Sequence, residues 1–152
     1  NLADLGKPLV IKMTIEAPGL VTLAENVFLV RGCVLTCQES NPVSRGARQY
    51  PFYVNRGWNE EETVFIQPAN GMTVGTLPPP VTTRSEMGSM VFNCSSQSDG
   101  SARCWRQFVA RRSRWPASAQ ENLRKMYDKI VEADRSAVAF QTTDGAGAAG
   151  SR

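Results

Sequence analysis

The residues best suited to covalent chemistry in this chain are its four cysteines. Cys94 and Cys104 lie in two apolar segments joined by a polar loop, so a hairpin would bring them face to face. Paired strands hold their Cα atoms within the roughly 7 Å that a disulfide requires. Cys33 and Cys37 are four positions apart, which in an extended strand corresponds to about 13 Å. Either a turn brings these two together or each pairs elsewhere.

Disulfides are the interpretation we favour for these cysteines, with buried free thiols and a four-cysteine zinc site as alternatives. The spacings C-x3-C and C-x9-C match the paired C-x2-C pattern of zinc sites poorly. Disulfides persist in oxidising compartments. The chain also begins Asn-Leu-Ala-Asp without a methionine, as a processed product would. We therefore expect an extracytoplasmic location: secreted, periplasmic, in an organelle lumen or on a particle surface.

Histidine is absent from the sequence. This removes the commonest general base, the commonest metal ligand and the usual pH switch. A catalytic cysteine would have no histidine to activate it, and the chain carries no glycine-rich phosphate loop and no metal-binding motif. We expect a protein that is not an enzyme and that uses no cofactor and no metal. A small enzyme or inhibitor without a recognisable motif stays as an alternative.

The third group with chemical potential is a basic segment rich in aromatic residues. Residues 1–102 carry 7 basic and 9 acidic side chains, whereas residues 103–152 carry 10 basic and 5 acidic ones. Guanidinium groups stack on aromatic rings and form bidentate pairs with carboxylates, a combination enriched at protein interfaces. We expect a partner-binding segment made of Arg103, Trp105, Arg106, Arg111, Arg112, Arg114 and Trp115.

Two other interpretations of this segment stay open: a solvated face, and a site for nucleic acid or anionic lipid. In a strand, Cys104, Arg106 and Phe108 share one face while Arg103 and Trp105 share the other, so the charge is divided between two faces. The prediction is an acidic protein partner, with nucleic acid possible but not favoured.

The elements that would position these residues are mainly strands. The organising hairpin runs from Met90 to Trp115. Apolar residues alternate with mostly polar ones over residues 8–16, which predicts a half-buried strand. Residues 26–38 predict two short strands with a bulge or a bend at Gly32 between them. Residues 49–55 predict a strand that carries Pro51, which places Pro51 in an edge strand or at a strand start. Residues 60–62 predict an acidic turn. Residues 63–67 and 72–77 flank Asn70-Gly71, a hairpin signal, and Pro78, Pro79 and Pro80 predict an extended connector.

One helix is expected near the C-terminus. Ser118 and Glu121 have the spacing of a capping box, and one apolar stripe follows them at three- and four-residue steps. The helix should span about residues 118–136. The stripe consists of Leu123, Met126, Tyr127, Ile130, Ala133 and Ala137.

The chain of 152 residues is long enough for one domain with its own core. We expect a β-rich domain over residues 1–142 and a flexible Gly/Ala tail over 143–152. The expected fold is mainly β: an antiparallel β-sandwich or partly open barrel of about six to eight strands with one C-terminal amphipathic helix. No apolar run is long enough to span a membrane.

We expect a non-catalytic binding or structural subunit of a larger extracytoplasmic assembly, hetero- or homo-oligomeric, which docks through the Arg/aromatic segment and its strand edges. The alternative is a capsid, filament or other particle-forming structural protein.

Overall fold

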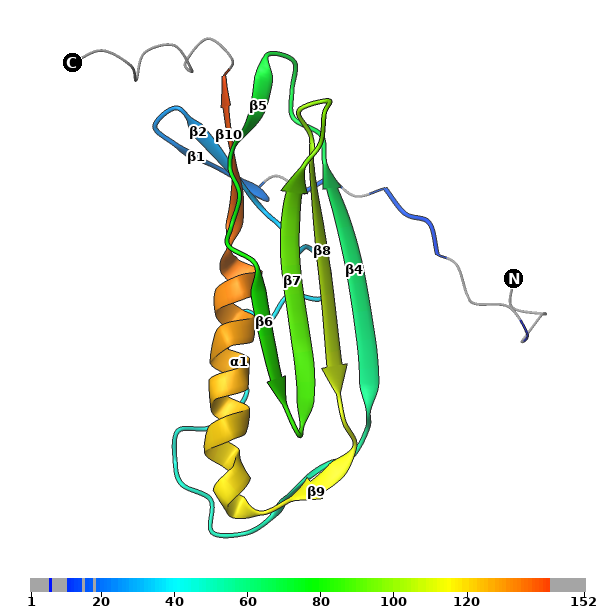
Figure 1. Cartoon of the computed structure of the whole chain (residues 1–152), viewed down its shortest axis with the longest axis vertical. Coiled ribbons are helices and arrows are strands. Elements are labelled where there is room, and N and C mark those ends of the chain that lie inside the picture. The colour runs from blue at the N-terminus through cyan, green and yellow to red at the C-terminus, as the bar shows by residue number, and fades with distance from the viewer. Residues whose placement is uncertain (1–5, 7–10, 15, 18, 143–152) are drawn as a thin grey trace.

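The computed structural model describes residues 6, 11–14, 16–17 and 19–142. This part of the chain is mainly β with one α-helix, as the sequence predicts (Figure 1). Its ten strands form three antiparallel sheets, so the expected strand number of six to eight was too low. None of the described helices, α1 (Gln120–Arg135) included, is long and apolar enough to cross a membrane. The predicted tail over residues 143–152 lies outside the described residues.

The longest strands form sheet C, in the order β4–β8–β7–β6. The predicted central hairpin is confirmed as its two inner strands, which pair along their whole length. Buried and more exposed side chains alternate along β8, because successive residues of a strand point to opposite faces. The bounds are β4 (Trp58–Ile66), β6 (Val81–Ser85), β7 (Gly88–Ser96) and β8 (Ala102–Ala110).

Sheet A lies across one end of sheet C, in the order β1–β2–β10–β5 (Figure 1). Its strand β10 follows the helix in sequence but lies between β2 and β5. Sequence analysis did not predict β10, because the helical stripe was extended to Ala137, where this strand begins. The bounds are β1 (Val21–Ala24), β2 (Val27–Arg31), β5 (Met72–Thr76) and β10 (Ala137–Thr142).

The helix and a two-stranded sheet complete the described part. Sheet B pairs β3 (Phe52–Val54) with β9 (Ser113–Trp115) at the other end of the molecule. The short 3-10 helix η1 (Ala117–Ala119) leads into α1 (Gln120–Arg135), which confirms the predicted helix. The predicted capping box is wrong, because η1 takes up Ser118 and the N-cap residue, Ala119, has no side chain that can accept a hydrogen bond.

One core joins the inner face of sheet C, sheet A and α1. Met126, Ile130 and Ala133 of the predicted helical stripe are buried against Phe108 and Phe140, with Leu123 and Tyr127 packed beside them. Beyond the helix, the sheet A strand β10 contributes Val138 to the same core.

Several predictions about strands and turns are wrong. Ile11–Thr14 and Glu16 belong to no strand and are exposed, while residues 8–10 and 15 lie outside the described residues. Residues 60–62 form part of β4 rather than a turn. Asn70-Gly71 does form a turn, since Met72 N donates to Ala69 O at 3.2 Å. The strands on its two sides, however, belong to different sheets, so there is no hairpin.

Only the first half of residues 26–38 is a strand, β2. Gly32 forms a bend directly after β2, one of the two alternatives expected for it, but the second short strand is absent from residues 33–38. Its backbone packs against the core, so that an added Cβ would come 2.9 Å from both Cys104 Sγ and Phe92 Cζ. Glycine is needed here because the backbone approaches these atoms too closely for any side chain. The chain then leaves the sheet as a loop over residues 33–38.

Candidate functional site

The cysteines form two disulfides. Cys94 and Cys104 are register partners on β7 and β8 with Cα atoms 4.0 Å apart, which confirms the predicted pair. Cys33 and Cys37 are bonded to each other with Cα atoms 5.7 Å apart. The loop that follows β2 supplies the turn that the sequence left open. No cysteine is left as a free thiol, so the cysteines offer no nucleophile while both bonds are closed.

The Cys33–Cys37 loop is held by one carboxylate, that of Glu62 on β4. Its Oε1 accepts hydrogen bonds from the backbone N–H groups of Val34 and Leu35 at 3.0 and 2.8 Å. Its Oε2 accepts from Thr36 Oγ1 at 3.0 Å and lies 3.3 Å from Cys33 Sγ. Glu62 is only 9% exposed. Burial of a carboxylate is tolerated when donors surround it, so this side chain serves to fix the loop.

A buried ion pair lies next to this loop. Arg106 on β8 is fully buried, and its Nε and Nη2 donate to Asp134 Oδ1 and Oδ2 at 2.7 and 2.9 Å. Its Nη1 reaches Thr36 Oγ1 at 3.2 Å, and Gln38 N donates to Asp134 Oδ2 at 2.8 Å. The prediction that Arg106 contacts a partner is therefore wrong. Its charge is used inside the domain to join β8, α1 and the loop.

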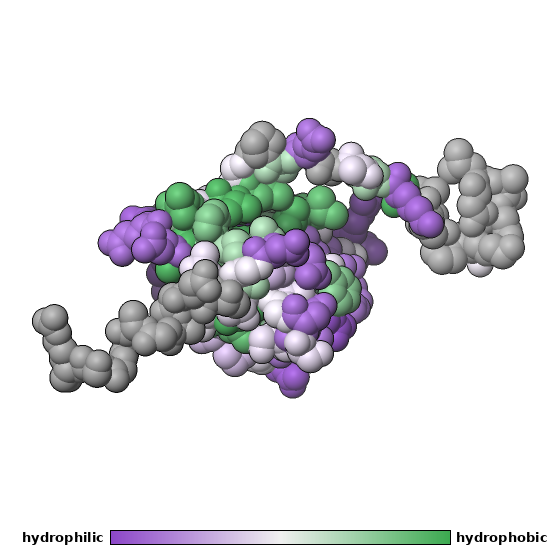
Figure 2. All heavy atoms as spheres, turned by 90° about the horizontal axis from the view of Figure 1, so that it is seen from above, coloured by the Kyte–Doolittle hydropathy of each residue, from purple (hydrophilic) through white to green (hydrophobic). Residues whose placement is uncertain are grey.

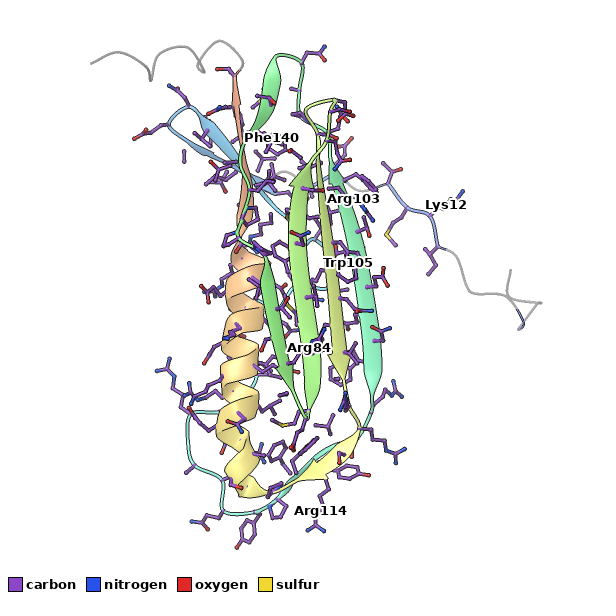
Figure 3. The ribbon with its side chains drawn as sticks, viewed as in Figure 1. Lys12, Arg84, Arg103, Trp105, Arg114 and Phe140 are labelled. Carbon is purple, nitrogen blue, oxygen red and sulfur yellow. A yellow bond between two sulfur atoms is a disulfide. The ribbon has the colours of Figure 1, made fainter. Side chains whose placement is uncertain are left out.

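The other predicted partner-binding residues do not form one patch (Figure 3). Arg103 lies over the Phe65 ring at 5.8 Å, and Trp105 Nε1 donates to Glu61 at 2.8 Å, both on the outer face of sheet C. Arg111 and Arg112 follow β8 at its far end and are exposed. Exposed Arg114 and half-buried Trp115 belong to β9 at that same end. The structure thus divides the segment into two surfaces.

A surface that sequence analysis missed lies on sheet A. Val21 and Leu23 of β1 pair with Val30 and Phe28 of β2, which in turn pair with the buried Val138 and Phe140 of β10. Directly opposed residues of antiparallel strands point to the same face. The two β1 side chains therefore lie on the core side of sheet A, yet they are 50% and 60% exposed.

We call this uncovered core side of β1 the apolar ledge, defined by Val21 and Leu23. A groove of about 390 Å³ adjoins the ledge, and Val21 of the ledge lines it. Figure 2 looks down on this end of the molecule and shows hydrophobic residues gathered on one side of it. The ledge extends the core surface of sheet A beyond the elements that cover it. The groove is lined by Val21, Phe28, Val30, Ile66, Gln67, Pro68, Ala69, Met72 and Phe140.

The edge of β1 adds to the ledge. β1 has no second strand neighbour among the described residues, so one row of its backbone groups is available for pairing. The edge strand β4 of sheet C carries Glu60, Glu61 and Glu62, and charged residues discourage pairing at an edge. The residues of β1, Val-Thr-Leu-Ala, carry no charge. Of these two edges, β1 is the better suited to accept another strand.

Among the described residues, no group of three or more His, Cys, Asp or Glu side chains is placed to hold a metal ion. The arrangement instead defines a disulfide-bonded, mainly β domain with an apolar edge. Residues 25–140 match the family described as a domain of unknown function with a solved structure, DUF3858, and the protein belongs to this family. No curated protein and no solved structure matches the chain.

Proposed function

We propose that this protein is a non-catalytic structural subunit of a larger extracytoplasmic assembly. In this assembly, residues 8–16 of one copy, here called the arm, add as a strand to the edge of β1 in a second copy. The observation that carries the proposal is the apolar ledge, where Val21 and Leu23 lie on the core side of sheet A without cover. Strand addition would satisfy the backbone of the β1 edge and bury the ledge together.

The arm has the sequence that such an edge requires. Leu9, Ile11, Met13 and Ile15 fall on one face of an extended strand, and the other face carries Val10, Lys12, Thr14 and Glu16. Ile11 and Met13 are 68% and 67% exposed. A strand with one apolar face is stable only when that face is covered. Ile11 and Met13 of the arm, and the ledge itself, therefore lack apolar cover that the other could supply.

The direction of the described arm residues supports exchange between copies. Leu20 N donates to Ala17 O at 3.3 Å, and Gly19 has a φ of +111°. The described arm residues then lead away from the sheets, as the position of Lys12 shows (Figure 3). An arm that extends from its own domain is placed to reach the edge of a neighbouring copy.

The two disulfides support the extracytoplasmic part of the proposal, since such bonds persist in oxidising compartments. The arginines and aromatic residues on the two outer surfaces are left for further contacts within the assembly.

The mass of the native species, measured by sedimentation equilibrium, tests the proposal. The unmodified chain should associate. Leu23→Lys on the ledge and Met13→Lys on the arm should each give monomers. Thr22→Lys and Thr14→Lys place the same charge on the opposite faces of the same two segments, so they should leave association intact. Unfolding midpoints should change little, because all four positions are exposed.

Mixing the two monomeric variants provides a stricter test. The Leu23→Lys copy retains an intact arm and the Met13→Lys copy retains an intact ledge, so an equimolar mixture should form a complex in which the first donates to the second. An unmodified chain that stays monomeric at a concentration on the order of 10⁻⁴ M, where a contact of even modest affinity would form, would contradict the proposal. A mixture that stays monomeric would exclude the arm as the partner of the ledge.

A further inference from the structure

A second surface of the domain, independent of the ledge, has the features of a ligand site. It is a groove of about 490 Å³ between α1, the turn joining β6 to β7, and β9. Sites for small molecules commonly have volumes of about 300–1,000 Å³ and combine apolar walls with a few polar groups. The groove lies at the opposite end of the molecule from sheet A (Figure 1).

The rim of this groove is basic. Arg84 on β6 and Lys125 and Lys129 on α1 line it, against one acidic residue, Glu86. No acidic side chain of the described residues lies within ion-pair distance of Arg84 or Lys129, and Lys125 reaches Glu121 only at 3.8 Å. Three cations around one concavity raise the local concentration of anions.

The exit of β8 brings more positive charge to the same place. Arg111 N donates to Met87 O at 2.9 Å, which fixes the backbone at this exit to the turn between β6 and β7. Arg112 and Arg114 follow in sequence, and both are exposed. Arg111, Arg112 and Arg114 of the predicted Arg/aromatic segment therefore add to the positive electrostatic potential around the groove, although they do not line it.

The inner wall of the groove is apolar. Met87 and Met126 are each 4% exposed, and Ala119 and the indole of Trp115 line the groove beside them. The Trp115 Nε1–H group is a buried donor without a hydrogen-bond partner in the described structure. A buried donor that lacks a partner is uncommon in folded proteins. The groove thus combines an apolar wall with a cationic rim.

From this combination we infer that the groove binds a small amphiphilic anion, with an apolar body against Met87, Met126 and Trp115 and a carboxylate or phosphate head among Arg84, Lys125 and Lys129. Lysine and arginine recognise both head groups. A plain inorganic anion would leave the apolar wall uncovered, and a neutral apolar molecule would leave the cations unused.

The test is a titration of the full chain, labelled with ¹⁵N, with hexanoate, hexyl phosphate and 1-hexanol. The indole N–H resonance of Trp115 reports on this groove rather than on the ledge. Both anions should shift it in a saturable way, and the tighter of the two identifies the preferred head group. 1-Hexanol should bind at least tenfold more weakly. Raising the salt concentration should weaken the anions and not the alcohol.

A charge-reversed variant separates the groove from general surface charge. Arg84→Glu with Lys129→Glu should reduce hexanoate affinity at least tenfold. Arg103→Glu, an exposed arginine on the outer face of sheet C, should leave the affinity unchanged. Circular dichroism should show that both variants are folded. Equal affinity of the double variant and the unmodified chain would overturn the inference. So would equal binding of 1-hexanol and hexanoate, or the absence of a Trp115 shift at millimolar ligand.

Discussion

Arg106 and Asp134 form a bidentate ion pair that is shielded from solvent, with Nε–Oδ1 and Nη2–Oδ2 distances of 2.7 and 2.9 Å. Loss of Asp134 leaves the buried guanidinium of Arg106 with a single, more distant carboxylate, that of Glu60 at 3.7 Å. Asp134→Ala should therefore lower the free energy of unfolding by about 3–5 kcal/mol, measured by urea denaturation. Glu132→Ala removes an exposed carboxylate from the same helix and should cost less than about 0.5 kcal/mol.

Replacing both partners with leucine should cost less than Asp134→Ala alone, because no buried charge then lacks a partner. A double variant that is less stable than the single variant would show that the guanidinium is needed for its bonds to the Cys33–Cys37 loop rather than for the ion pair.

Ile130 tests how α1 is docked. Its side chain is fully buried in the core, so Ile130→Ala should cost about 2–5 kcal/mol through lost burial and the cavity left behind. Lys129→Ala, at an exposed neighbouring position, should cost under about 0.5 kcal/mol. Both values follow from thermal or urea unfolding, and equal small losses would mean that α1 is not packed on the sheets in solution.

Sequence patterns predicted those parts of the fold that depend on neighbours in the chain. The alternation of side chains along residues 102–110 predicted the strand, and it also predicted that Arg106 shares a face with Cys104 and Phe108. Its charge nevertheless suggested exposure, because its partner, Asp134, is 28 residues away and belongs to another element. Residues 60–62 were likewise predicted to be an exposed turn, because they are acidic and their partners are distant in sequence. The donors that allow Glu62 to be buried come from residues 34–36.

The two candidate sites could not be predicted from local patterns. The ledge depends on the pairing of β1 with β2 and of β2 with β10. The groove brings Arg84 next to Lys129 from another part of the chain. One sequence signal bears on the proposed use of the ledge: the apolar and polar residues that alternate over residues 8–16.

The two disulfides should differ in their response to a thiol reductant. Cys94 and Cys104 are buried on the inner face of sheet C, whereas Cys37 is half-buried in a loop whose neighbours Val34 and Leu35 are exposed. Thiol–disulfide exchange requires access of the attacking thiolate to sulfur. With increasing dithiothreitol under native conditions, alkylation and peptide mapping should detect Cys33 and Cys37 first. Earlier labelling of Cys94 and Cys104 would contradict the burial order.

Asp99, in the β7–β8 loop, should make a pH-dependent contribution to the stability of the folded state. Its carboxylate accepts from Ser101 Oγ at 2.6 Å and from Ser101 N at 3.0 Å, and these bonds hold the pKa of Asp99 below its ordinary value. A lowered pKa in the folded state means stability that is present above the unfolded-state pKa. This stability is lost as the pH falls through the folded-state pKa.

Ser101→Ala should raise the pKa of Asp99 toward its ordinary value, measured by carboxyl ¹³C titration. Glu121 is the matched control. Its pKa is lowered chiefly by the hydrogen bond from Arg124, so it should not respond to Ser101→Ala and should rise in Arg124→Ala. A response of both carboxylates to Ser101→Ala would indicate a general change of structure rather than loss of one bond.

The position of β10 constrains the order in which this protein can be built during synthesis. Ala137–Thr142 pairs with β2 on one side and with β5 on the other, so neither strand can complete its pairing before the ribosome has passed residue 142. The β1–β2 hairpin is made more than 100 residues earlier and has to wait with its apolar side chains uncovered. Throughout that interval the β1–β2 hairpin lacks its β10 neighbour, and a chain that stops at the end of α1 lacks the strand that joins β2 to β5.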